Sequence, residues 1–351
     1  MTNKHASYDL KQMQAVPLQG KIIMTQQRIR QWYEHWEGQV YVSFSGGKDS
    51  TVLKHIVDSM YDDVPAVFVN TGLEYPEIQQ FVRSINAGKY DCFNSDIEIL
   101  RPEMRFDEVI KEYGYPVISK EVSERVCYAR KGAKWAIDCM HGLNSKGEQS
   151  DFRKMFIKYK YLLEAPFDVS NYCCNVMKKM PAKKYGKKYG RKPIIGTLAS
   201  ESTRRKQSWL KNGCNAFNTK EPTSQPLSFW TEQDILHYIK QFDVPYCSVY
   251  GDIVPTSEGE QVEGQITTFD ILGDYEGTLL KTTGCNRTGC IFCMFGCHLE
   301  KEPNRFQRLK VTHPKQYEYC IGGGEMVDGK WQPNKEGLGL GKVLDYIGVD
   351  Y

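Results

Sequence analysis

The residues with the clearest chemical potential are the eight at positions 43–50, Ser-Phe-Ser-Gly-Gly-Lys-Asp-Ser. The paired glycines lack Cβ atoms and tolerate positive φ, so backbone N–H groups can turn toward the oxygens of an anion. The lysine adds a positive charge, and a helix starting here would add the positive end of its dipole. The pattern is not the Gly-x-x-x-x-Gly-Lys-Ser/Thr loop. We therefore predict a phosphate site at Ser43, Phe44, Ser45, Gly46, Gly47, Lys48, Asp49 and Ser50, with Lys48 and Asp49 as catalytic candidates.

Cysteine thiols are the second group of residues with clear chemical potential. Cys173 and Cys174 are adjacent, and Cys290 and Cys293 form a Cys-x-x-Cys pair in a glycine-rich segment. Such a pair points two thiolates at one centre, and the Cys-Cys pair can complete a four-thiolate site. We expect a [4Fe–4S] cluster, with zinc as the alternative. Cys285 could replace one of the first two cysteines, Cys297 is a weaker candidate, and Cys320 could be a free reactive thiol.

The elements around the loop alternate between strands and helices. An apolar strand at 39–44 precedes the loop, and the pattern predicts a helix at 49–60, a strand at 64–69, a helix at 76–86 and a strand at 97–100. Alternation at this spacing is typical of α/β proteins with a doubly wound, mostly parallel, Rossmann-like sheet. Ligands of such sheets lie beyond the carboxyl ends of the strands, where both the loop and Asn70-Thr71-Gly72 fall.

Composition limits the class of protein. The chain has 351 residues, of which 40% are hydrophobic and 25% charged, and a net charge of +3. These fractions are ordinary for a soluble protein, and the apolar runs are too short to span a bilayer. Because the N-terminus has no apolar signal segment, we expect a cytoplasmic protein whose 12 cysteines include metal ligands rather than disulfides. The expected segments are an N-terminal helical part at 1–38, a nucleotide-binding domain at 39–250, an inserted hairpin or loop at 251–283 and a cysteine-rich C-terminal segment at 284–351.

Several stretches resemble one enzyme superfamily in order and spacing. The loop matches the pyrophosphate loop (PP-loop) of the ATP pyrophosphatases and phosphoadenylylsulfate (PAPS) reductases. Asn70–Glu77 resembles their Asp/Asn-Thr-Gly…Tyr-Pro-Glu segment, and Gly196–Arg205 resembles Gly-x-Arg-x-x-Glu-Ser-x-x-Arg. Pro226–Asp234 with Pro245-Tyr246 resembles a further segment, which we interpret as structural. The Cys-Cys…Cys-x-x-Cys arrangement resembles that of the iron–sulfur members.

The resemblance implies roles for these residues. Asn70, Thr71 and Gly72 would lie against the adenine, and Glu77, Gly196 and Glu201 near the nucleotide. Arg205 would clamp a phosphate or substrate anion, because guanidinium matches a phosphate edge with two hydrogen bonds. The iron–sulfur members imply Cys173, Cys174, Cys290 and Cys293 as cluster ligands.

A basic run follows the Cys-Cys pair, with Tyr185 and Tyr189 among its residues. It could follow a nucleic-acid backbone, neutralise a cluster or nucleotide, or be a solvated helix face. DNA or tRNA is therefore a candidate partner, and a homo-oligomer remains open. The run comprises Lys178, Lys179, Lys183, Lys184, Lys187, Lys188, Arg191 and Lys192.

Two reactions fit a phosphate loop beside a cluster. In the first, ATP with Mg²⁺, to which Asp49 is a candidate ligand, adenylates a substrate and releases pyrophosphate, and sulfur from a donor such as a cysteine desulfurase replaces AMP. In the second, a thiolate attacks bound PAPS or adenylylsulfate (APS) and releases sulfite. Leu198 stands where the reductases have an arginine, and residues 322–351 contain no cysteine, so we favour sulfur transfer, with similarity to the iron–sulfur subunits of DNA phosphorothioation systems or to tRNA-thiolation enzymes. A non-catalytic nucleotide-binding module is the remaining alternative.

Overall fold

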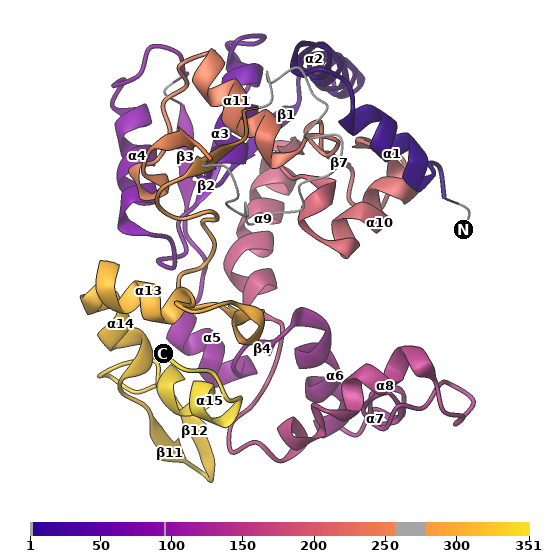
Figure 1. Cartoon of the computed structure of the whole chain (residues 1–351), viewed down its shortest axis with the longest axis vertical. Coiled ribbons are helices and arrows are strands. Elements are labelled where there is room, and N and C mark those ends of the chain that lie inside the picture. The colour runs from indigo at the N-terminus through magenta and orange to yellow at the C-terminus, as the bar shows by residue number, and fades with distance from the viewer. Residues whose placement is uncertain (1–2, 95, 257–277) are drawn as a thin grey trace. The chain divides into compact units, whose positions relative to one another are not determined.

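A computed structural model describes residues 3–94, 96–256 and 278–351. The chain divides into two compact units (Figure 1). Unit 1 contains the described residues within Met1–Asn70, Glu74–Leu100 and Ala182–Thr288, and unit 2 contains Thr71–Leu73, Arg101–Pro181 and Gly289–Tyr351. Residues 101–181, expected within the nucleotide-binding domain, thus group with the C-terminal segment. No described helix is both long and apolar enough to cross a membrane.

Unit 1 is built on a six-stranded sheet with the order β3-β2-β1-β5-β7-β6. All neighbouring strands pair in parallel except β6 and β7, which are antiparallel. This confirms the predicted α/β class with a mostly parallel sheet. The strands are β1 (Val40–Phe44), β2 (Ala66–Val69), β3 (Ile97–Leu100), β5 (Lys192–Ile195), β6 (Asn215–Ala216) and β7 (Thr223–Ser224).

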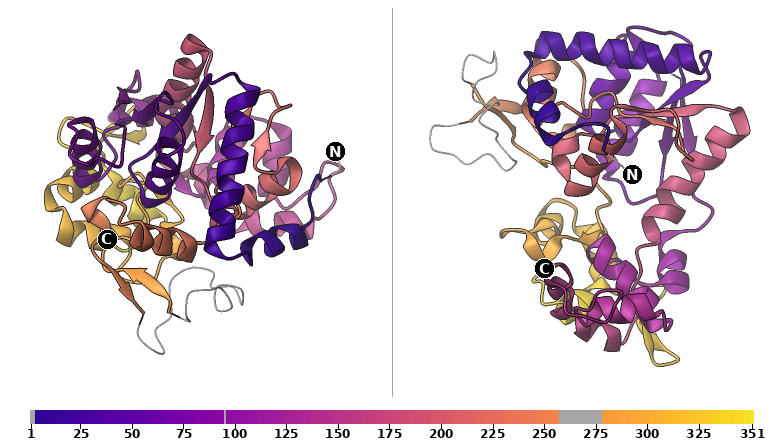
Figure 2. Two further views of the ribbon diagram at one scale, coloured as in Figure 1. Left: turned by 90° about the horizontal axis from the view of Figure 1, so that it is seen from above. Right: turned by 90° about the vertical axis from the view of Figure 1, so that its right-hand side faces the viewer.

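Side chains alternate between the two faces of β1 because successive residues of a strand point to opposite sides. Val40, Val42 and Phe44 belong to the main core, whereas Tyr41 packs in a smaller cluster with Val67 and Tyr185. Helices therefore cover both faces, as a doubly wound sheet requires. The long indigo helix α2 lies on the outside of unit 1 in both views of Figure 2.

The helices of unit 1 begin and end close to the predicted positions. The helices predicted at 49–60 and 76–86 are α3 and α4, and the N-terminal helices pack into the main core through Leu10, Ile29 and Trp32. The helices are α1 (Ser7–Gln14), α2 (Leu18–His35), α3 (Lys48–Asp58), α4 (Pro76–Asn86), α9 (Met180–Tyr189, shared between the units), α10 (Thr203–Asn212) and α11 (Glu232–Gln241), with short turns at η3 (Ala199–Glu201) and η4 (Ser248–Tyr250).

The predicted insertion is anchored by a pair of strands. β8 (Ile253–Pro255) pairs antiparallel with β9 (Leu280–Thr282), as a hairpin requires. Gln233 in α11 holds this base, since its amide donates to the Leu280 carbonyl and accepts the Leu280 N–H, both at 2.9 Å. The rest of the predicted insertion, residues 257–277, lies outside the described residues.

Unit 2 is mainly helical. Two short parallel strands, β4 and β10, bring Val117-Ile118 beside Met294-Phe295, which joins the middle of the chain to the cysteine-rich segment. Its elements are α5 (Phe106–Tyr113), β4 (Val117–Ile118), α6 (Lys120–Arg130), α7 (Lys134–Met140), α8 (Asp151–Ile157), η1 (Lys160–Glu164), η2 (Asn175–Lys179), β10 (Met294–Phe295), η5 (Cys297–Leu299), α13 (Arg305–Thr312), α14 (Pro314–Ile321), β11 (Glu325–Val327), β12 (Lys330–Gln332) and α15 (Leu340–Tyr346).

Candidate functional site

The predicted phosphate loop connects β1 to α3 in unit 1. Gly46 has φ of +72°, and Gly47 is the N-cap residue of α3. A Cβ atom at Gly46 would lie 2.7 Å from Ile78 Cγ2, so the turn needs glycine for both conformation and space. β1 lies between β2 and β5 in the sheet, which places the loop at the point where the strand order reverses.

Serine hydroxyls brace the loop from within. Ser50 Oγ donates to the Gly47 carbonyl at 2.9 Å and accepts the Ser45 N–H at 3.2 Å. Ser45 Oγ lies 2.9 Å from Ser50 Oγ and accepts the Gly47 N–H at 3.4 Å. The two serines of the Ser-Gly-Gly-x-Asp-Ser pattern thus fix the turn that presents the amides.

Lys48 is held among carboxylates. Its side chain is buried, and Nζ lies 3.3 Å from Asp49 Oδ1 and 3.1 Å from Glu232 Oε1. Nζ also donates to the Asn286 carbonyl at 3.3 Å. Burial acts to lower the pKa of Lys48, but the charges of Asp49 and Glu232 outweigh it and raise the pKa above its usual value. The lysine therefore remains a cation at neutral pH.

Tyr250 and Thr288 cover the loop, and neither was among the predicted site residues. The Lys48 N–H donates to Tyr250 Oη at 3.1 Å, and this hydroxyl lies 2.7 Å from Thr288 Oγ1. A Cβ atom at Gly47 would lie 2.9 Å from Thr288 Oγ1. An anion that takes the Lys48 amide must therefore replace a hydroxyl already bound there. No local sequence motif identifies either residue as part of this site, because both lie in segments far from the loop along the chain.

The segment after β5 meets the other side of the loop. A Cβ atom at Gly196 would lie 3.0 Å from the Asp49 carbonyl oxygen and from Ser50 Cα, so Gly196 lets the two segments touch. Arg205 interacts electrostatically with Asp49 and with Arg287. Burial lowers the pKa of Arg205, while Asp49 acts to raise it. Arg287 is a second guanidinium near this site that the sequence did not single out.

Glu201 has a local role here. It forms an ion pair with Arg205 and accepts the Leu198 N–H at 3.0 Å, which fixes the turn before α10. Leu198, which stands where the reductases have an arginine, is 3% exposed and lies in the core. Arg205 is thus positioned near the loop by the residues around it, and its role as a phosphate clamp remains a prediction.

The remaining predicted nucleotide contacts divide between the units. Asn70 and Glu77 belong to unit 1, whereas Thr71 and Gly72 belong to unit 2. Asn70 Nδ2 donates to Gln79 Oε1 at 3.3 Å, and Glu77 lies near the Cys247 thiol, whose pKa is raised chiefly by burial. The adenine-binding role of these residues remains a prediction.

Four of the five predicted metal ligands belong to unit 2. The thiols of Cys173, Cys174, Cys290 and Cys293 lie close enough to perturb one another electrostatically. A hydrogen bond between Cys173 and Cys174 raises the pKa of Cys173 and, with help from the nearby Lys120, lowers that of Cys174. Among the described residues, however, no three His, Cys, Asp or Glu side chains form a group that could hold a metal ion as they stand.

The other candidate thiols have different surroundings. Cys285, the fifth predicted ligand, belongs to unit 1. Cys297 is 1% exposed and its Sγ donates to the Met294 carbonyl at 3.0 Å. Cys320 is fully buried in α14, and burial raises its pKa strongly. Such a thiol is a poor nucleophile, because the reactive form is the thiolate.

The basic run lies mostly on α9. Lys183, Lys184, Lys187 and Lys188 are exposed, and Lys183 forms an ion pair with Glu221. Tyr185 is 5% exposed and packs edge-on against Tyr41 beneath the sheet. The expected interleaving of aromatic and basic residues is therefore limited to Tyr189.

Comparisons with known proteins place the chain in one family. The family model for the phosphoadenosine phosphosulfate reductase domain matches residues 39–137 and 134–294. An uncharacterized protein of Methanocaldococcus jannaschii is 27% identical over 233 residues, which cover 63% of this chain and 41% of that protein. The chain thus matches less than half of this relative's length.

Two further similarities carry functional names. An adenosine 5'-phosphosulfate reductase of Staphylococcus epidermidis is 22% identical over 234 residues, covering 65% of this chain and 72% of that enzyme. A crystal structure of phosphoadenylyl-sulfate reductase from Candida auris, in a phosphate complex, covers 71% of this chain and 92% of that one, with 13% identity and a TM-score of 0.36. The match of the family model to most of the chain, over a sheet and loop of the predicted kind, shows that this protein belongs to the phosphoadenosine phosphosulfate reductase domain family, a family of enzymes.

Proposed function

We propose that this protein is an ATP-dependent sulfur-transfer enzyme. The phosphate tail of ATP binds at Ser45–Ser50, an oxygen of the acceptor attacks the α-phosphorus, and pyrophosphate leaves. A persulfide formed on a donor such as a cysteine desulfurase then attacks, through its terminal sulfur, the carbon that bears the adenylated oxygen, and AMP leaves with that oxygen. The carbon–oxygen bond breaks as the carbon–sulfur bond forms, and a thiol then cleaves the remaining sulfur–sulfur bond, which supplies two electrons and leaves a disulfide as the oxidised product.

The observation that carries the proposal is the gathering of cations around Asp49. Lys48 forms an ion pair with Asp49, and Arg205 interacts electrostatically with Asp49. Arg287 adds a further positive charge through its interaction with Arg205. These charges and the amides at the start of α3 suit a triphosphate whose leaving group becomes more negative during the reaction. The proposal therefore assigns charge stabilisation to Lys48 and Arg205.

Asp49 suits a Mg²⁺ ion that accompanies ATP. Its Oδ1 atom is buried and accepts no hydrogen bond from the described residues, although it lies 3.3 Å from Lys48 Nζ, so it has room for a further partner. Mg²⁺ in nucleotide sites is commonly held by one or two carboxylates and the substrate phosphates. When bound, the ion would neutralise phosphate charge, while Asp49 orients it.

The four thiols of unit 2 suit a [4Fe–4S] cluster by donor type. Thiolates are the usual ligands of such clusters, and Cys174 is the thiol most readily deprotonated in the Cys173–Cys174 pair. The thiols would still have to move together, because they form no metal group as they stand. When bound, a cluster would supply sulfur or electron chemistry, and the buried Phe292 and Met294 nearby would limit its access to water.

Reduction of APS or PAPS is the second candidate, favoured by the reductase from Staphylococcus epidermidis that covers 65% of this chain. Here the loop would hold the nucleotidyl sulfate and a thiolate would attack sulfur. The full burial of Cys320 argues against this thiol as the nucleophile. Sulfur transfer therefore remains our first proposal.

Nucleotide turnover on anaerobically purified protein separates the candidates. We expect AMP and pyrophosphate from ATP in the presence of acceptor and sulfide, lost in Lys48→Ala and Asp49→Asn but retained in Lys89→Ala, which changes an exposed lysine of unit 1. Sulfite formed from APS or PAPS with a thiol reductant, and abolished by Cys320→Ser, would replace this proposal with the reductase. Nucleotide binding without either turnover would leave only a binding module.

Metal and sulfide analysis of the same sample tests the cluster. We expect iron and acid-labile sulfide, reduced in Cys290→Ser and Cys293→Ser and unchanged in Cys214→Ser, whose thiol lies in the core of unit 1. A colourless protein that contains zinc would contradict the cluster and favour a structural metal.

A further inference from the structure

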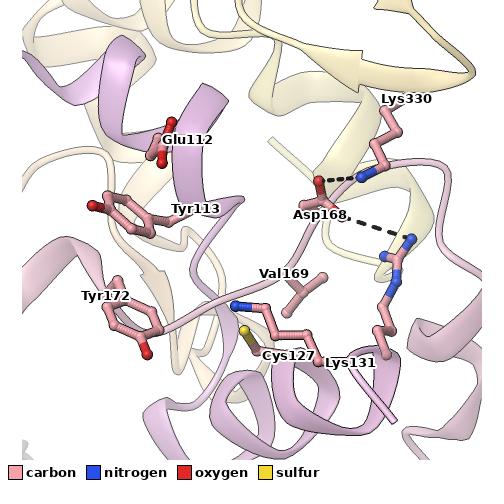
Figure 3. Close-up of a pocket in the computed structure, with 9 residues that line it drawn as sticks. Glu112, Tyr113, Cys127, Lys131, Asp168, Val169, Tyr172 and Lys330 are labelled. Atoms are coloured by element: carbon pink, nitrogen blue, oxygen red, sulfur yellow. Dashed lines mark hydrogen bonds and ion pairs between the residues drawn. The ribbon is translucent and has the colours of Figure 1, made fainter.

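A cavity of about 340 Å³ lies wholly within unit 2 (Figure 3). Its volume is within the range of sites for small molecules, about 300 to 1,000 Å³. Tyr113 and Tyr172 line one side, Lys131 and Cys127 come from the end of α6, and Asp168 and Lys330 line the opposite side. The predictions from sequence assigned none of these residues to a binding site.

Backbone contacts fix the floor of this cavity. Gly114 ends α5 with φ of +100°, and a Cβ atom there would lie 2.3 Å from the Asp168 carbonyl carbon. The Tyr115 N–H donates to the Asp168 carbonyl at 2.7 Å, and the Ser170 N–H to the Tyr115 carbonyl at 3.1 Å. The chain before Cys173 is thereby held against α5, and Tyr113 and Tyr172 come together.

A row of partly exposed aromatic rings begins in the cavity. Tyr113 and Tyr172 stack with their centroids 5.2 Å apart and their planes 18° from parallel. Tyr128 Oη lies 3.4 Å from Tyr172 Oη, and the Tyr128 ring packs at 5.4 Å against Trp135, which is 48% exposed. Rings that remain accessible in this way offer stacking surfaces to planar ligands.

The charges beside the rings are mainly positive. Asp168 is shared by two cations, Lys330 Nζ at 2.7 Å and Arg130 Nη2 at 3.8 Å. Lys131 forms no ion pair among the described residues, and its Nζ lies 6.0 Å from the Tyr172 ring centroid. At the other end, the carboxylate of Glu112 can accept hydrogen bonds from a ligand amino group. The cavity thus combines stacking surfaces with an available cation.

We infer that this cavity binds a nucleotide unit, with its base stacked on Tyr172 or Tyr113 and its phosphate near Lys131. Stacking on aromatic side chains and phosphate contacts to basic ones are the usual means of binding single-stranded nucleic acid. The same chemistry would accept a free nucleoside monophosphate. The row of aromatic rings that leads to Trp135 favours single-stranded nucleic acid as the ligand, because it continues the stacking surface beyond one base.

Tyr172 directly precedes Cys173-Cys174, so the bound unit would lie beside the proposed cluster ligands of the same unit. Its role as sulfur acceptor rests on the proposed function, whereas its binding does not. Oligonucleotide binding without any AMP formation would therefore contradict the sulfur-transfer proposal and leave this inference intact.

Fluorescence anisotropy with labelled single-stranded DNA and RNA of mixed sequence tests the site on the full chain. We expect Tyr172→Leu to weaken binding by about tenfold or more and Tyr172→Phe to retain it, since stacking needs the ring and not the hydroxyl. Lys131→Ala should weaken binding and reduce the dependence of log K on log salt by about one charge. Lys315→Ala and Tyr8→Leu, which change exposed residues outside the cavity, are the matched controls.

Competition with CMP and AMP separates the two sources of the ligand. Single-stranded nucleic acid is the ligand if the oligonucleotide binds far more tightly than either monophosphate. A free nucleotide is the ligand if a monophosphate binds as tightly as the oligonucleotide and its binding depends on Tyr172 in the same way. Lys48→Ala should leave oligonucleotide binding unchanged, which would show that the oligonucleotide does not bind at the phosphate loop. The inference is overturned if no probe binds at low salt, or if Tyr113→Leu, Tyr172→Leu and Lys131→Ala, each folded by circular dichroism, bind like the controls.

Discussion

Lys48 in the phosphate loop and Glu232 at the start of α11 form an ion pair at 3.1 Å within the candidate nucleotide site. A phosphate that binds Lys48 Nζ would have to compete with this carboxylate for the ammonium group. Because Glu232 is 28% exposed at its side chain, it can turn toward solvent when an anion binds. The pair therefore acts as a local competitor of the nucleotide.

Glu232→Gln should tighten ATP binding by about two- to fivefold, because a partly exposed ion pair is worth up to about 1 kcal/mol and the anion no longer has to displace it. Isothermal titration calorimetry measures the change. Glu221→Gln, which removes the exposed partner of Lys183, is the control and should leave the affinity unchanged. Weaker ATP binding in Glu232→Gln would mean that Glu232 helps to hold the nucleotide or its metal.

The affinity for ATP should be nearly constant between about pH 7.5 and about pH 9.5. The carboxylates raise the pKa of Lys48, so the lysine loses its proton only above its ordinary value of about 10.4. Calorimetric titrations across this range check the expectation. A loss of affinity centred below about pH 9 would show that burial, which acts to lower the pKa, prevails over Asp49 and Glu232.

Gly46→Ala should destabilise unit 1 by more than the strain of its backbone alone. Positive φ costs a residue with a Cβ atom about 1 kcal/mol or more, and the new methyl group would also meet Ile78 Cγ2 at 2.7 Å. Gly88→Ala is the matched control, since Gly88 has φ of +67° and no atom of the described residues lies within 4 Å of its Cβ position. Urea unfolding should show a larger loss for Gly46→Ala, and equal losses would contradict the close contact.

Lys21→Met should lower the free energy of unfolding by about 3–5 kcal/mol, because it leaves the Asp234 carboxylate buried without its cation. Lys21 Nζ lies 2.8 and 2.6 Å from the two oxygens of Asp234, which is 0% exposed. Asp234 Oδ2 also accepts the Thr231 N–H at 2.6 Å and caps α11. Lys183→Met, which breaks an exposed pair, should change stability by less than about 1 kcal/mol in the same denaturant series.

This ion pair also explains one segment that resembles the family. The Trp-Thr-x-x-Asp stretch was interpreted as structural, and Thr231 and Asp234 form a capping box at the start of α11 while Trp230 donates to Thr25 at 2.8 Å. The same helix contributes Glu232 beside Lys48. A segment with a structural purpose thus also contributes a charge to the candidate site.

The sequence by itself determined the elements and the loop. Glycine at 46 and 47, the apolar strand before them and the helical spacing after them are local properties, and the turn at 43–50 and helices α3 and α4 follow from them. The parallel sheet followed from the alternation of strands and helices. Local backbone preference and periodicity act over a few residues, so a reader of the sequence can detect them.

Only the tertiary structure decided which side chains meet. Glu232, Tyr250 and Thr288 reach the loop from distant segments, and the sequence assigned none of them to the site. Arg287 likewise comes from a distant segment to interact with Arg205. The sequence also did not predict that residues 101–181 group with the C-terminal segment, or that Tyr113 stacks on Tyr172. Such contacts depend on how the whole chain packs, because long-range contacts result from the burial of many residues together and not from the type or spacing of a few.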